Sequence, residues 1–142
     1  MKKLSFFFLF SFLTISCEKE LFNEDYNYMY GDWIPVHLDC GMGHDIKPQL
    51  FCDFLQILKN GTYKVIRNGN TIESGKIEAE SQTVNKLSII FIPEKIDFGS
   101  DSFIRLPHST TLDVITFTQD SIHIQNRAVD GGYFGVTLRR KN

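Results

Sequence analysis

The sequence predicts an all-β domain, built as a sandwich or a barrel of about eight or nine short strands. Apolar and polar residues alternate through most of the chain after Gly31, which is the pattern of strands with one buried face. Turn signals such as Asn60-Gly61 and Asn68-Gly69 interrupt this alternation at short intervals. No window shows the apolar stripe of a helix, so we expect the whole domain to be strands and turns.

The first strand is expected over residues 33–38, where side chains alternate in polarity. Residues 41–50 hold two glycines and a proline and predict a long loop. Residues 54–58 and 62–67 then form a hairpin, because Asn60-Gly61 between alternating runs is a strong hairpin signal.

Asn68-Gly69 leads into a strand over 71–78. Residues 93–101 are the least regular part of the chain and predict a loop or a single helical turn. The tight Gln119-Asp120 turn joins two late strands, and Asp130-Gly131-Gly132 leads into the last one. The remaining strands are expected at 86–92, 102–106, 112–118, 121–127 and 133–140.

The N-terminus has the features of a secretory signal peptide over residues 1–16. Lys2 and Lys3 precede an apolar run, and Ser16 is the small residue before the cut. The run is about a dozen residues long, whereas a membrane-spanning helix needs about 20.

A cysteine, Cys17, follows Ser16 directly, and this ending resembles the lipobox of bacterial lipoproteins, although Thr14 stands where leucine is usual. The resemblance implies that the Cys17 thiol takes a diacylglycerol and that its freed amine takes a third acyl chain. An ordinary cleavable signal with an incidental Cys17 is the alternative. The acidic stretch Glu18-Lys19-Glu20 resembles the export signal of some Gram-negative lipoproteins, which implies an outer-membrane protein facing the periplasm or the surface.

Residues 17–30 are expected to form a lipidated tether and a tyrosine-rich flap packed under the domain, which itself covers 31–142. The chain has 15 Lys and Arg against 17 Asp and Glu, and loss of Lys2 and Lys3 with the signal takes the formal net charge from −2 to −4. This mildly acidic balance argues against nucleic acid as a partner. The membrane contact is expected to be the acyl chains alone.

Several short motifs, in their order along the chain, resemble lipocalins and small bacterial lipocalin-like lipoprotein domains. They are Gly31-Asp32-Trp33, Leu55-x-Ile57 before Asn60-Gly61-Thr62-Tyr63, Gly75, Phe117-Thr118-x-Asp120 and Leu138-x-Arg140. The resemblance implies an up-and-down antiparallel β-barrel. It also implies that Trp33 lies at the closed end and that Arg139 or Arg140 stacks on it.

Cys40 and Cys52 remain in an exported, oxidising compartment if Cys17 is acylated, so a disulfide between them is expected. It would close a loop of about a dozen residues and contribute roughly 3 kcal/mol in the chain-entropy model. Two free thiols are one alternative. A zinc set with His37 and His44 is another, but the spacing lacks a Cys-x₂-Cys pair, and we expect no metal and no cofactor.

His108-Ser109 with Asp113 invites a hydrolase interpretation, but the nucleophile elbow Gly-x-Ser-x-Gly is absent from the sequence. We therefore expect a protein that is not an enzyme.

The barrel interior is the remaining candidate site, and its expected lining contains no charged residue. An eight-stranded barrel can be filled by side chains or can hold one small ligand. We expect a small apolar ligand; the alternative is an envelope inhibitor or accessory subunit that works through loops 41–50 or 93–111. The candidate ligand-binding residues are Tyr63, Ile89, Phe91, Ile115 and Phe117.

Overall fold

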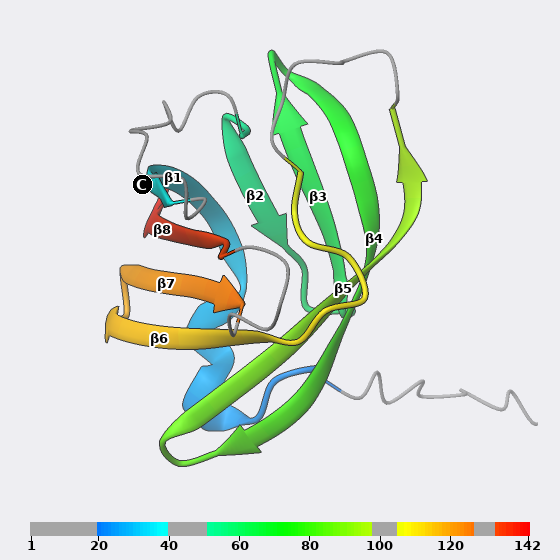
Figure 1. The fold of residues 1–142 in the computed structure, drawn as a ribbon. Helices are drawn as coiled ribbons and strands as arrows, with labels where there is room; N and C mark the ends of the chain where they lie inside the picture. The colour runs from blue at the N-terminus through cyan, green and yellow to red at the C-terminus, as the bar shows by residue number, and fades with distance from the viewer. Residues whose placement is uncertain (1–19, 40–50, 98–104, 127–132) are drawn as a thin grey trace, which may run out of the picture.

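The chain forms a closed barrel of eight antiparallel strands in a computed structural model that describes residues 20–39, 51–97, 105–126 and 133–142. Each strand pairs with its neighbour in sequence, and the last strand closes the barrel on the first (Figure 1). The all-β prediction and the up-and-down order are therefore confirmed. The elements are η1 (Glu24–Met29), β1 (Gly31–Asp39), β2 (Phe54–Ile57), β3 (Thr62–Arg67), β4 (Asn70–Thr83), β5 (Lys86–Ile96), β6 (Leu112–Thr118), β7 (Ser121–Asn126) and β8 (Gly135–Arg140).

The two Asn-Gly signals form the turns that the sequence predicts. Gly61 closes the β2–β3 hairpin with φ of 76°, and Asn68 and Gly69 close the β3–β4 hairpin with φ of 51° and 75°. Positive φ at both central residues matches the twist of the flanking strands. Local turn chemistry thus sets the register of β2, β3 and β4.

The β4–β5 hairpin is longer than predicted, because Pro93–Ile96 continues β5 instead of forming a loop. Its tip lies beside η1, at the lower left of Figure 1. Gly75 allows the two strands to approach at a register shift, since a Cβ there would collide with the backbone of Ile92 and Pro93. The hairpin therefore needs glycine at this position because glycine has no side chain, and not because the position has a positive φ.

The prediction of a strand at 102–106 is wrong for the residues of this range that the structure describes. Arg105, Leu106 and Pro107 have no regular structure, and residues 102–104 lie outside the described residues. Proline lacks the N–H that a ladder needs, so Pro107 interrupts strand pairing. His108 instead forms one isolated parallel bridge with Phe91 of β5.

The segment before β1 is part of the core. Phe22, Tyr26, Met29 and Tyr30 are buried, and Phe22 packs on Tyr30 with ring centroids 5.2 Å apart. The described part of this segment has η1 as its only regular element. The largest fully buried side chains are Trp33, Tyr63, Phe22, Phe51, Phe91, Met29, Leu38, Leu55, Ile57, Leu87, Ile89 and Leu112.

Within the described ranges, no helix is long and apolar enough to cross a membrane.

Candidate functional site

Trp33 and Arg140 meet at the end of the barrel that η1 covers. The Arg140 guanidinium carbon lies 4.6 Å from the centroid of the Trp33 ring, within the range of a cation–π contact. Trp33 is fully buried and its indole N–H donates to the carbonyl of Met29 at 2.8 Å. The structure thus selects Arg140 from the two arginines predicted, while Arg139 is exposed.

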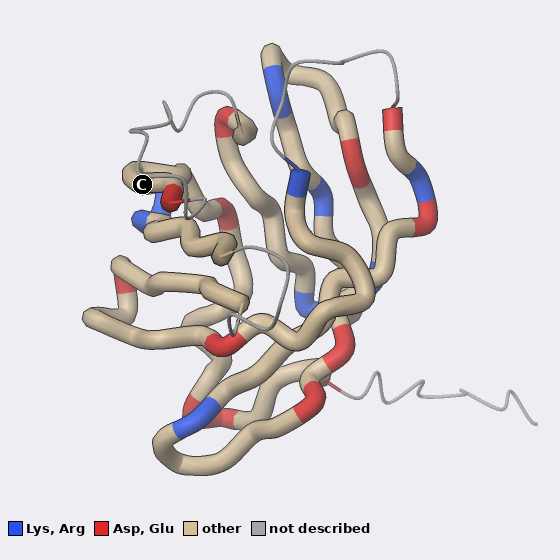
Figure 2. Tube along the Cα trace, in the orientation of Figure 1, with Lys and Arg blue, Asp and Glu red and all other residues tan. Residues whose placement is uncertain are grey.

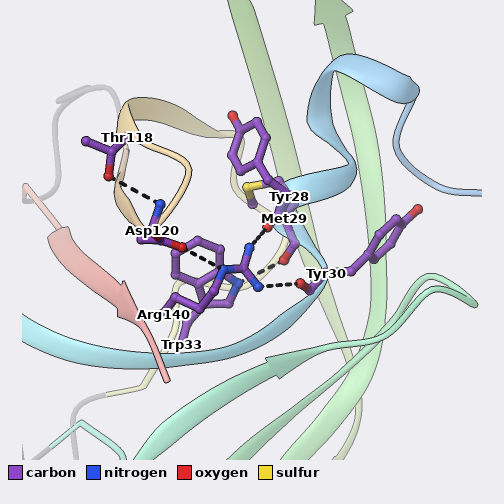
Figure 3. Close-up of polar contacts among 7 residues, drawn as sticks. All are labelled: Tyr28, Met29, Tyr30, Trp33, Thr118, Asp120 and Arg140. Carbon is purple, nitrogen blue, oxygen red and sulfur yellow. Dashed lines mark hydrogen bonds and ion pairs between the residues drawn. The ribbon is translucent and has the colours of Figure 1, made fainter. Parts of the chain in front are cut away.

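Arg140 also ties the flap to the last strand (Figure 3). Its guanidinium donates to the carbonyl oxygens of Tyr28 and of Tyr30, the second at 3.0 Å, and forms an ion pair with Asp120 at 3.2 Å. Gly31 makes room for it: φ is 129°, and a Cβ would lie 2.7 Å from Arg140 Nη1. The glycine and tryptophan of the Gly31-Asp32-Trp33 motif therefore serve the closure of the barrel, not a binding site.

A second polar cluster lies inside the barrel, around Glu73 of β4. The Tyr63 hydroxyl donates to Glu73 Oε1 at 2.6 Å, and His108 Nε2 lies 2.9 Å from the same oxygen. Glu73 is only 1% exposed, whereas the His108 side chain is partly exposed. Two side chains thus converge on one oxygen of a buried carboxyl group.

The other oxygen, Glu73 Oε2, is buried and has no hydrogen-bond partner among the described residues. A buried polar atom without a partner costs about 1–3 kcal/mol, and more when it is charged. Buried unsatisfied atoms are few in native proteins, and each needs an explanation. This oxygen is therefore the feature of the interior that packing alone does not account for.

Burial sets the protonation state of two groups near Glu73. Burial, the hydrogen bond to Glu73 and the charge of Glu73 together raise the pKa of the Tyr63 hydroxyl, which stays protonated and remains a donor. Burial, with smaller contributions from Asp53 and Glu73, raises the pKa of the Cys52 thiol, so Cys52 is not a nucleophile. Tyr63 therefore serves the cluster as a hydrogen-bond donor to Glu73.

The expectation that the interior lining contains no charged residue is wrong, because the buried Glu73 belongs to it. It lies four residues before the buried Ile77 and two before the buried Gly75, on the same alternating face of β4. Alternation along β4 thus predicts the inward position of Glu73, which the expected lining leaves out.

Three of the candidate ligand-binding residues are where they were expected. Tyr63, Ile89 and Phe91 are fully buried, and the rings of Tyr63 and Phe91 meet edge to face with centroids 4.8 Å apart.

Ile115 and Phe117 were wrongly placed inside. They are 41% and 60% exposed, because β6 turns Leu112 and Val114 to the core and a register shift follows between Thr116 and Thr118. Both faces of β6 carry apolar residues, so the alternation does not show which face is buried, and the prediction took the wrong one. Ile115 instead lines an outer groove of about 390 Å³ with Val84 of the β4–β5 turn and Tyr28 of η1.

The hydrolase residues have separate partners. His108 contacts Glu73, whereas Asp113 accepts from the hydroxyl of the buried Ser88 at 2.7 Å. Ser109 has a positive φ of 54°. The structure pairs the histidine and the aspartate with different residues and does not link them to each other.

The cysteine predictions are tested only in part. Cys52 is buried and forms no disulfide with a described residue, and its expected partner Cys40 lies outside the described residues, as do Cys17 and His44. Across the described part of the chain, no three His, Cys, Asp or Glu side chains are grouped to hold a metal ion.

The sequence matches no protein-family model, and a search of curated proteins finds no significant match.

Proposed function

We propose that the chain is a lipid-anchored, non-enzymatic binding protein of a Gram-negative envelope, and that its barrel holds a small, largely apolar ligand at Glu73. The single observation behind the ligand is Glu73 Oε2, a buried oxygen without a partner among the described residues. Small-molecule sites are mostly apolar with a few placed polar groups, and the interiors of β-barrels are a preferred place for them. Tyr63, Phe91 and Ile89 supply the apolar surroundings.

The chemistry of Glu73 narrows the ligand class. A carboxylate only accepts hydrogen bonds, and Oε1 already accepts one from the Tyr63 hydroxyl and lies against His108 Nε2. Oε2 therefore needs a donor, such as a protonated amine or a hydroxyl. A carboxylic acid would bring a second negative charge against it, so fatty acids are disfavoured. The large side chains packed around the site restrict the ligand to a short chain.

A series of six-carbon probes tests this proposal: hexylamine, hexanol and hexanoic acid, titrated calorimetrically at pH 7. We expect affinity to fall in that order for the wild type. Glu73→Gln should weaken the binding of hexylamine about 10-fold to 100-fold, because a hydrogen bond to a charged group contributes about 1.5–3 kcal/mol. The same substitution should change the affinity for hexanol much less.

The matched control is Glu78→Gln, an exposed glutamate on the same strand, which should leave all three affinities unchanged. Binding of hexanoic acid at least as tight as that of hexylamine contradicts the assignment of Glu73. Absence of binding by the wild type for every probe, together with a stability gain in Glu73→Gln, would show that Glu73 is a buried charge without a ligand.

The second candidate is an envelope interaction protein, and the exposure of Ile115 and Phe117 on the outer face of β6 favours it. If that face binds a partner, Phe117→Ser should abolish co-purification of one specific envelope protein without changing the unfolding midpoint. Ile115 and Phe117 would then act from outside the barrel, independently of Glu73.

A further inference from the structure

We propose that the tip of the β4–β5 hairpin rests on the bilayer when Cys17 is acylated, so that the barrel stands with this hairpin toward the membrane. The inference rests on the lipid anchor of the proposed function and is independent of the ligand. It also revises the expectation that acyl chains are the whole membrane contact.

The distance from the lipid to the folded domain is short. Only residues 18–20 separate Cys17 from Leu21, whose carbonyl accepts from Gln82 Nε2 at 2.9 Å. Gln82 Oε1 in turn accepts from the Asn23 backbone N–H at 2.8 Å, and Phe22 between them is buried. Four residues span at most about 14 Å, so Leu21 is held within that distance of the acylated cysteine.

Leu21 is attached next to the hairpin tip. Gln82 lies two residues before Val84 in the β4–β5 turn, and the Tyr26 hydroxyl of η1 donates to the Thr83 carbonyl at 2.6 Å. Figure 1 shows the tip beside η1. The opposite end of β4 begins at Asn70, about 43 Å away along a strand that rises about 3.3 Å per residue. The anchor therefore brings the tip, and not the far end of β4, to the membrane.

The tip has the chemistry of an interfacial contact. Val84 is 83% exposed, more than any other large exposed hydrophobic side chain among the described residues, and it borders the groove formed with Ile115 and Tyr28. Figure 2 shows acidic positions near this end and no block of basic ones among the residues it describes. The contact is therefore expected to be mainly apolar and to depend little on ionic strength.

Fluorescence quenching by lipid tests the orientation. Trp33 is the chain's single tryptophan and is buried. Val84→Trp adds a tryptophan at the tip, and Thr71→Trp adds one at an exposed position near the far end of the same strand. The acylated full-length proteins would be placed in phosphatidylcholine vesicles that contain brominated phosphatidylcholine, whose bromine quenches only nearby indoles.

We expect quenching and a blue-shifted emission for Val84→Trp, at low and at high salt, and wild-type behaviour for Thr71→Trp. Equal quenching of both variants would mean that the barrel lies on its side, and no added quenching at Val84 would mean that the tip stays in water; either result overturns the proposal. Mass spectrometry and vesicle flotation separate these results from failure of the anchor, because an unacylated protein would not float with the vesicles.

Discussion

Replacing Cys17 with alanine is expected to abolish acylation completely and to leave either an uncleaved precursor or a protein released from the membrane. The lipobox resemblance assigns two acyl chains to this thiol and the third to the amine that cleavage frees on the same residue. Three acyl chains anchor almost irreversibly, since each buried CH₂ contributes about 0.8 kcal/mol, so a cleaved Cys17→Ala protein should move from the membrane fraction to the soluble one. Metabolic labelling with a fatty acid and fractionation of the envelope would measure both effects.

Cys40→Ala is the matched control, because it removes a cysteine of the same chain that is not at the cut and should retain the label. Label on the Cys17→Ala protein would refute the anchor. That result would also refute the proposal that the β4–β5 hairpin faces the membrane. It would leave the proposed ligand at Glu73 untouched, because that proposal depends on the barrel alone.

The strands were predictable because their signals are local. Asn68-Gly69 requires positive φ and takes it, and most alternating runs became strands of the barrel. The closed topology and the Trp33–Arg140 contact are different, because they join residues from opposite ends of the chain. They were expected only from the resemblance to lipocalins, since no local pattern specifies that β1 and β8 meet.

The failures have a common physical cause, which is that tertiary contacts decide between locally equivalent choices. In β6, apolar residues occupy both faces, so Val114 and Ile115 were equally good candidates for the core. Pro107 ended a run that otherwise resembled a strand. Glu73 shares the inward phase of β4 with Gly75 and Ile77, but the side chains that meet it there, Tyr63 and His108, come from other segments. The proposed site is therefore built from contacts that alternation does not encode.

The barrel is closed by a residue that contacts three separate parts of the chain. Arg140 binds the carbonyls of Tyr28 and Tyr30 in the flap, packs on Trp33 of β1 and pairs with Asp120 in the β6–β7 turn. Phe22 and Met29, buried at the same end, depend on this attachment of the flap. The attachment of the flap and the closure of the barrel thus share one side chain.

Arg140→Ala should therefore destabilise the domain by about 2–4 kcal/mol, since it removes a cation–π contact and charge-assisted hydrogen bonds that are half-buried. Arg140→Lys should recover only part of the loss, because an ammonium lacks the planar fork that reaches two carbonyls and the indole face together. Arg139→Ala is the control next to it in β8: its side chain is exposed, and such a surface change should stay within about 0.5 kcal/mol. Urea unfolding of the four proteins measures these differences. Equal, small losses at both arginines would mean that Arg140 does not hold the flap, and that burial of Phe22 and Met29 alone keeps it in place.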